Sequence, residues 1–145
     1  GIVVDPSALP WAGVACLKHA YQLYRERGYR TRLLAAAYRH HLHWSEFIGG
    51  ELTLTMPALW QRRFNASAVA VVSRIERPVD PAIVAELLRA FPDFGKAYDP
   101  TGLRREEFDD YGATRRTLRA FLGAYSELLA LVRDAMLPNP DLRAS

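Results

Sequence analysis

Apolar positions in the first thirty residues follow the period of an α-helix. From Trp11 onward they recur every three or four residues, at Val14, Leu17, Tyr21 and Tyr24, which places them on one helical face. Ser7 to Pro10 precede this pattern as a start signal, and Gly28 follows it as a stop signal. We therefore predict an amphipathic helix between the two signals.

Two apolar segments with the character of strands come next. Residues 31–37, Thr-Arg-Leu-Leu-Ala-Ala-Ala, form a run without alternation that is typical of a strand buried in a parallel sheet, although the alanines also suit a helix. Residues 51–56 alternate apolar and polar side chains with the period of a strand. Short helices are predicted after each strand, at 42–48 and 58–64. This order of elements predicts a parallel α/β unit.

The second half of the chain is predicted to be mainly helical. Residues 65–80 read as a connector with one candidate short strand at 69–72, and Asp80-Pro81 is a start signal for a helix. Residues 91–103 are rich in turn formers. A long helix is predicted at 113–137, with one apolar stripe and arginines on its other side, ending before Pro138.

Composition and charge narrow the functional classes. The chain has 145 residues and one cysteine, Cys16, so we expect a reduced packing residue and no internal disulfide. No apolar run is long enough for a membrane span and no signal peptide is recognisable, which predicts a cytoplasmic protein without a membrane partner. The net charge of +3 is spread along the chain without a basic run, which argues against a nucleic-acid partner.

The most informative candidate for chemistry is Arg39, in the segment Tyr38-Arg39-His40-His41. This segment lies where the first predicted strand gives way to a helix, and ligands of parallel α/β folds bind at the carboxyl ends of strands. A guanidinium there is placed to hold a phosphate, with help from the positive end of the helix. The alternative is that Arg39 pairs with a carboxylate at the rim of the fold.

Other candidate chemistries have less support. His40, His41, His43 and Glu46 are metal-ligand types, but adjacent histidines point in different directions and no second matched pair exists, so we predict no metal site. Cys16 lies within an amphipathic helix, and no Gly-x-Ser-x-Gly motif occurs. Neither Lys18 nor Lys96 lies at a predicted strand end, where a Schiff-base lysine would be expected. We therefore predict no catalytic residue in this chain.

Four segments between Tyr24 and Leu59 form one block: Tyr24-Arg-Glu-Arg-Gly28-Tyr29, Ala35-Ala-Ala37-Tyr38-Arg39-His40, Gly49-Gly50, and Leu54-Thr55-Met56-Pro57-Ala58-Leu59. This block resembles the C-terminal part of the transaldolase family, without a gap. The resemblance implies an α/β fold, a (β/α)8 barrel whose last two parallel strands are residues 31–37 and 51–56. It also implies transfer of a dihydroxyacetone unit between sugar phosphates through a lysine Schiff base, with no cofactor.

The resemblance also assigns residues. It places Arg39 on an arginine that helps bind the substrate phosphate. Ala37, Tyr38 and His40 stand where the family has serine, phenylalanine and asparagine, and they would form the pocket wall beside that arginine. These three departures would alter the substrate pocket.

Length limits what this chain can contain of such an enzyme. A full barrel takes about 250 residues, so 145 residues cannot contain it. The resemblance implies that the reactive lysine and its partner carboxylates lie on earlier strands of the barrel and would precede Gly1. We expect a C-terminal barrel fragment, helix-dominated overall: the last βα units at 1–64, a connector at 65–80 and a helical C-terminal region at 81–145. The isolated chain is expected to be inactive. Its open strand edges would need either the N-terminal part of the parent barrel or self-association.

Two alternatives from other functional classes stay open. The chain could be a non-catalytic helical module whose broad apolar faces dock onto a partner protein. It could also be a sugar-phosphate binding protein that retains the phosphate corner without the chemistry. The C-terminal region of a transaldolase-like enzyme is the leading hypothesis of the three.

Overall fold

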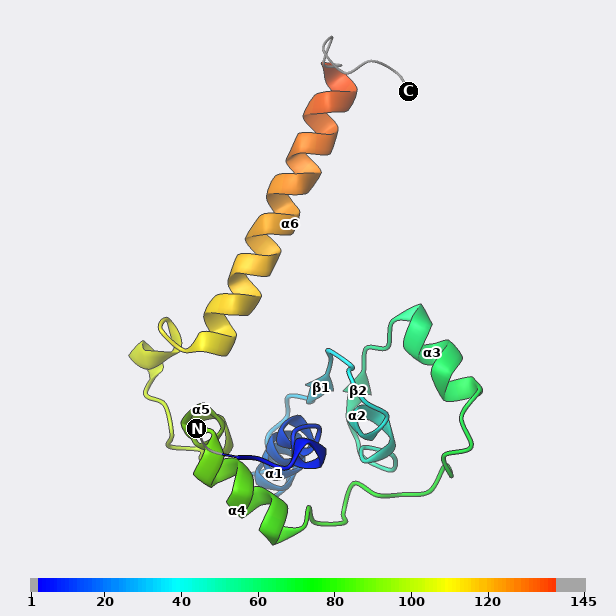
Figure 1. Ribbon diagram of the computed structural model, residues 1–145, viewed down its shortest axis with the longest axis vertical. Helices are drawn as coiled ribbons and strands as arrows, with labels where there is room; N and C mark the ends of the chain where they lie inside the picture. The colour runs from blue at the N-terminus through cyan, green and yellow to red at the C-terminus, as the bar shows by residue number, and fades with distance from the viewer. Residues whose placement is uncertain (1–2, 138–145) are drawn as a thin grey trace. The chain divides into compact units, whose positions relative to one another are not determined.

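The computed structural model describes residues 3–137, and within them it has six α-helices and two short strands (Figure 1). The chain divides into two compact units, with the second beginning at Leu103. The first unit holds α1 (Trp11–Glu26), β1 (Leu34–Ala35), α2 (Leu42–Ser45), β2 (Thr53–Leu54), α3 (Ala58–Asn65), α4 (Pro81–Ala90) and α5 (Pro92–Tyr98). The second unit holds α6 (Gly112–Met136).

The first helix forms where the apolar period predicted it. A 3-10 turn, Pro6–Ala8, precedes it and is capped by Asp5, whose carboxylate accepts the Ser7 backbone N–H at 2.9 Å. After Glu26 the chain turns at Gly28, which has a φ of 62°. That left-handed conformation is the reason glycine serves as a stop signal here.

The two strands pair in parallel, as predicted, but they are much shorter than the sequence pattern indicated. Leu34 lies opposite Thr53 and Ala35 opposite Leu54. Ladder bonds run from the Thr53 N–H to the Leu33 carbonyl at 2.9 Å and from the Thr55 N–H to the Ala35 carbonyl at 3.0 Å. Within residues 3–137 no third strand extends this pair. Helices therefore dominate the fold, and two short strands do not establish a barrel.

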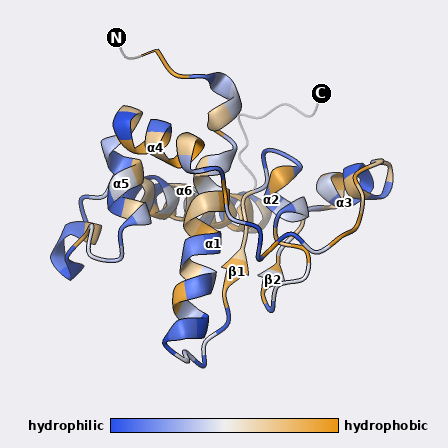
Figure 2. Cartoon of the chain, turned by 90° about the horizontal axis from the view of Figure 1, so that it is seen from below, coloured by the Kyte–Doolittle hydropathy of each residue, from blue (hydrophilic) through white to orange (hydrophobic). Residues whose placement is uncertain are grey.

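The core of the first unit forms on two sides of α1. One cluster joins α1 to the strands and to the turn after α2, through Val14, Tyr21, Ala35, Phe47 and Ile75. The other joins α1 to α4 and α5, through Ala8, Ala15, Leu87 and Phe94. In Figure 2, β1 carries the hydrophobic colour, whereas the last turns of α1 are hydrophilic. This packing fixes β1 and the segment that follows it against α1.

Two predictions about the second half were wrong. Residues 69–72 form no strand, because their exposed backbone has no neighbouring strand to pair with. Residues 91–103, expected to be turns, include α5, which starts at Pro92 and packs against α4 and α1. Its burial of Phe94 stabilises a short helix that Gly95 argues against, and Pro92 is at the first helical position, where proline favours a helix start. The predicted cap was correct, since Asp80 accepts the Ala82 N–H at 2.8 Å.

The connector between α3 and α4 returns to the end of α2. The backbone N–H groups of Arg74 and Ile75 both donate to the Ile48 carbonyl, at 2.9 and 3.2 Å. Gly49 is required at this crossing, because its φ is 91° and a Cβ there would lie 2.2 Å from the Ser73 hydroxyl oxygen.

In the second unit, α6 spans 25 residues, and none of them is buried. Its apolar stripe is exposed, with Leu118 at 57% and Met136 at 75%. Over residues 3–137, no helix combines the length and the apolar character needed to cross a membrane. The helix ends at Met136, one residue before the predicted end, and Pro138 lies outside the described residues.

Candidate functional site

The candidate site is a cavity of about 630 Å³ in the first unit, at the carboxyl end of β1. Apolar residues of α1, β1 and the α2 segment line most of it, including Leu17, Leu34 and Phe47. Among the described residues that line it, Arg39 alone is always charged. Ala37 and His43 lie at the same part of the wall. The cavity thus combines an apolar interior with a single guanidinium, a composition common to small-molecule sites.

Arg39 is exposed at the turn that follows β1. Its Nη1 donates to the Ala37 carbonyl at 3.1 Å, which uses one of the five guanidinium N–H groups. Ala37 has a φ of 64°, in the left-handed region that residues other than glycine rarely adopt. Ala37 lies two residues after the end of β1 and two residues before Arg39, and both line the cavity. Strained backbone of this kind is concentrated at binding sites.

The sequence left open an ion pair between Arg39 and a carboxylate. Within residues 3–137 no Asp or Glu lies at ion-pair distance from Arg39, whereas seven other ion pairs are present. Its remaining donors are therefore not neutralised by a described carboxylate. That leaves the guanidinium suited to an anionic ligand.

The first turn of α2 contributes no free amide to the cavity. The Leu42 N–H donates to His40 Nδ1 at 3.3 Å, and the His43 and Trp44 N–H groups donate to the carbonyls of His40 and His41. The helix has four residues, Leu42–Ser45. The expected help from a helix N-terminus is therefore not available, and Arg39 is the principal donor.

Tyr38 and His40, which the resemblance placed beside Arg39, lie differently. The Tyr38 side chain is buried, with its ring centroid 6.3 Å from that of Trp60 in α3, and it is not among the cavity-lining residues. Burial raises the pKa of the Tyr38 hydroxyl. His40 stacks on His41 with ring centroids 4.2 Å apart, and it too is absent from the lining. The resemblance therefore assigned four residues to the site, and two of them, Ala37 and Arg39, line the cavity.

His43 is the site residue that sequence reasoning did not assign. Its Nδ1 accepts the Arg39 backbone N–H at 3.1 Å, and its Nε2 donates to the Pro10 carbonyl at 3.0 Å. Desolvation lowers the pKa of His43. The hydrogen bond to Pro10 opposes this shift, whereas His40 and Arg39 add smaller lowering contributions. The contact of His43 with Arg39 could have been predicted, because the two residues are four positions apart. The contact with Pro10 could not, because it depends on tertiary packing.

No metal centre is formed in the part of the chain that the structure describes. No group of three or more His, Cys, Asp or Glu side chains comes together there as metal ligands would. Both ring nitrogens of His43 already bind backbone groups, and Nδ1 of His40 does too. Glu46, the carboxylate considered with them, pairs with Lys18 instead.

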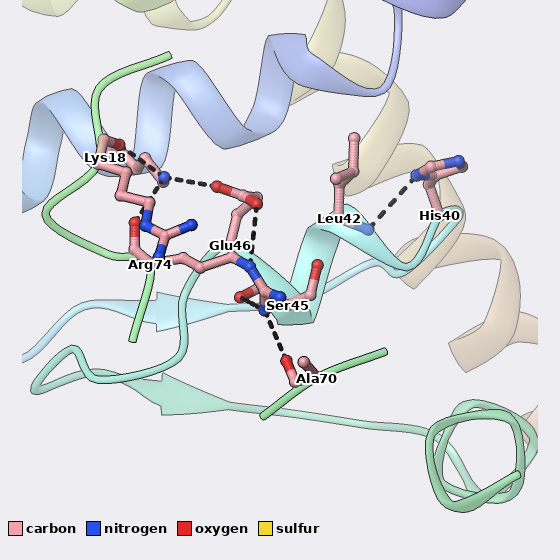
Figure 3. A network of polar contacts seen from close by, with 8 residues as sticks. Lys18, His40, Leu42, Ser45, Glu46, Ala70 and Arg74 are labelled. Atoms are coloured by element: carbon pink, nitrogen blue, oxygen red, sulfur yellow. Dashed lines mark hydrogen bonds and ion pairs between the residues drawn. The ribbon is translucent and has the colours of Figure 1, made fainter. Parts of the chain in front are cut away.

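Lys18 holds α2 in place rather than facing the cavity (Figure 3). Its Nζ donates to Glu46 Oε2 at 2.7 Å and to the carbonyls of Arg74 and Arg77 at 2.9 and 2.8 Å. All three ammonium hydrogens thus have acceptors. The Arg74 guanidinium also approaches Glu46, with 3.9 Å between Nε and Oε1. This buried network ties α1 to the end of α2 and to the connector.

Cys16 lines the cavity but has the properties of an unreactive thiol. Burial raises its pKa to about 11, so the nucleophilic thiolate is disfavoured. The other lysine, Lys96, is exposed on α5, where it pairs with Asp93 at 3.3 Å. The cavity therefore presents one guanidinium suited to an anion, and its described lining residues include no paired acid and base for bond breaking.

We compared the chain with known protein families, with curated proteins and with solved structures, and none of them matches it. The functional argument consequently depends on the cavity and on the residues around Arg39.

Proposed function

We propose that this chain is the C-terminal region of a transaldolase-like enzyme and supplies part of its sugar-phosphate site. The observation that carries the proposal is the position of Arg39 at the carboxyl end of β1, in an apolar cavity and without a carboxylate partner among the described residues. Barrels of the (β/α)8 class often bind phosphate near the loops after their last two strands. Arg39 would act as an electrostatic clamp that orients the substrate.

In this proposal the chain binds substrate but does not break bonds. Transfer of a dihydroxyacetone unit requires a lysine that forms a Schiff base, and such a lysine is an uncharged nucleophile when it attacks. Lys18 donates to three oxygens and Lys96 is solvated, so neither is suited to that role. We expect borohydride trapping with fructose 6-phosphate, followed by peptide mapping, to yield no sugar adduct. An adduct on either lysine would overturn this part of the proposal.

A second candidate is a helical module that docks onto another protein. The specific observation in its favour is α6, whose apolar stripe is exposed along its whole length. Exposed apolar surface of this extent marks interaction sites in soluble proteins. This candidate does not account for Arg39, and the two functions are compatible in one chain.

The phosphate site is tested by mapping ligand contacts on the full chain in solution. We expect fructose 6-phosphate to shift the NMR signals of the Arg39 guanidinium and of the amides of 36–39, and fructose to shift them much less. A competing location exists at the other end of β1, where Arg30 and Arg32 line a second cavity of about 320 Å³. Shifts confined to that cavity, or equal shifts with both sugars, would contradict the proposal.

A further inference from the structure

His43 connects two parts of the chain that together form one wall of the cavity. Its Nε2 reaches the Pro10 carbonyl, directly before α1, at 3.0 Å. Its Nδ1 reaches the Arg39 backbone N–H, two residues after the left-handed residue Ala37 in the segment that follows β1, at 3.1 Å. The imidazole is therefore a bridge that fixes the backbone of Arg39 relative to α1.

Both contacts define the protonation state of the ring. The Arg39 N–H can only donate, so Nδ1 must carry no hydrogen. The Pro10 carbonyl can only accept, so Nε2 must carry one. The bridge thus requires the neutral Nε2–H tautomer. A protonated ring would direct an Nδ1–H at the Arg39 N–H, and that contact would be lost.

The surroundings of His43 favour this neutral form. The ring is half-buried against the apolar lining, and its titratable and charged neighbours are Arg39 and His40 from its own segment and Cys16 of α1 in the same cavity. The rings of His40 and His43 are 6.4 Å apart. The segment before α1 faces it with the neutral Pro10 carbonyl. Desolvation lowers the pKa of His43 below its ordinary 6.5, against the hydrogen bond to Pro10, and His40 and Arg39 lower it further by smaller amounts.

We propose that His43 is a positioning residue for Arg39, and that its neutral form is required for the anion site to hold its shape. This inference rests on the proposed function, since it concerns the same guanidinium. Its consequence is a site that weakens on acidification. The stabilising bridge is complete above the ordinary histidine pKa of 6.5 and is lost as the pH falls through the lowered value in the folded chain.

Affinity for fructose 6-phosphate between about pH 7.5 and about pH 5.5 tests the inference. The key variant is His43→Asn, because the asparagine Oδ1 occupies the place of Nδ1, accepts the Arg39 N–H and does not titrate. A sugar phosphate also gains a proton near about pH 6, so the wild type is compared with His43→Asn at each pH. Between the higher and the lower pH, we expect the wild type to lose roughly three- to tenfold more affinity than His43→Asn, which lacks the Pro10 contact but keeps the Arg39 contact at both pH values.

Two further variants separate positioning from other roles. His43→Leu removes both contacts, and we expect roughly three- to tenfold weaker binding at about pH 7.5. His19→Asn is the matched control, because His19 contacts the Tyr98 carbonyl and lies outside this cavity. It should retain the pH profile of the wild type. If the wild type instead binds more tightly on acidification than His43→Asn, the imidazolium binds the phosphate directly and the positioning role is wrong.

An NMR titration without ligand distinguishes failure of this inference from failure of the proposed function. We expect the Arg39 amide signal and the His43 ring nitrogens to titrate together, below pH 6.5. If the two signals titrate together but the sugar phosphate binds elsewhere, the positioning role of His43 is supported and the phosphate site at Arg39 is wrong. If the Arg39 amide does not follow His43, or His43→Leu folds and binds as the wild type does, the positioning role is overturned.

Discussion

The ammonium of Lys18 and the carboxylate of Glu46 are 2.7 Å apart and nearly buried, with 7% and 12% of their side chains exposed. Lys18 belongs to α1, and Glu46 follows directly after α2. The pair therefore fixes the segment that contains His43 against α1, which also lines the cavity. Burial of a charge is costly unless it is paired and hydrogen-bonded, and here both conditions hold.

Lys18→Met should destabilise the chain by about 3 to 5 kcal/mol, because it leaves Glu46 charged and buried without its main partner. The Arg74 and Arg77 carbonyls would lose a donor as well. Lys96→Met is the matched control, since Lys96 is the other lysine of the chain and its pair with Asp93 is about half exposed or more on both sides. It should change stability by less than about 1 kcal/mol. Urea unfolding of both variants gives the comparison, and equal losses would mean that the buried network contributes little.

Removal of the Tyr38 hydroxyl is expected to stabilise the chain. Among residues 3–137 it is the buried side-chain polar atom that has no hydrogen-bond partner. Tyr38→Phe removes an unsatisfied group and should raise the free energy of unfolding by about 1 kcal/mol. Tyr21→Phe is the control, because the buried Tyr21 hydroxyl accepts the Glu51 N–H at 3.3 Å and its loss should cost about 1 kcal/mol. A loss of stability in Tyr38→Phe would show that the hydroxyl has a partner in solution.

The apolar stripe of α6 predicts self-association of the chain. Its members alternate spacings of four and three residues, the repeat of a helix-pairing seam, at Leu118, Leu122, Tyr125, Leu129, Val132 and Met136. We expect sedimentation to show a mass that increases with concentration. Leu129→Glu should weaken this association by at least about tenfold, since it places a charge in the seam.

The control for the α6 prediction lies on the same helix. Leu131 is 69% exposed but falls outside the four-and-three repeat. Leu131→Glu should therefore leave the association nearly unchanged. A monomer at all concentrations, or an equal effect of the two substitutions, would contradict the role of the seam.

Local patterns predicted the elements that depend on local interactions. The helix start at Asp80-Pro81 and the parallel pairing of β1 with β2 followed from capping residues and from apolar runs. The length of the strands did not follow from local patterns, because a strand continues only where a neighbouring strand supplies hydrogen-bond partners. The helix α5 was missed for a related reason, since burial of Phe94 outweighs the poor helix propensity of its sequence.

The candidate site was predictable in part. Arg39 was identified because it follows an apolar run, and that position depends on the strand alone. The roles of Lys18 and His43 depend on contacts with residues 28 and 33 positions away in sequence. A signal for Lys18 was present, because it lies three residues before Tyr21 and four after Val14, within the apolar face of α1. A lysine in such a stripe indicates a buried ion pair.

The central claim is that Arg39 binds the phosphate of a sugar phosphate, and a thermodynamic cycle tests it most directly. Calorimetry would measure fructose 6-phosphate and fructose with the wild type, with Arg39→Ala, and with Arg62→Ala, an exposed arginine of α3 outside the cavity. We expect Arg39→Ala to lose about 1.5 to 3 kcal/mol, roughly ten- to a hundredfold, with the phosphorylated sugar only. Arg39→Lys should recover part of that loss, and Arg62→Ala should bind as the wild type does. Equal losses with both sugars, or equal losses in the two alanine variants, would contradict the phosphate site.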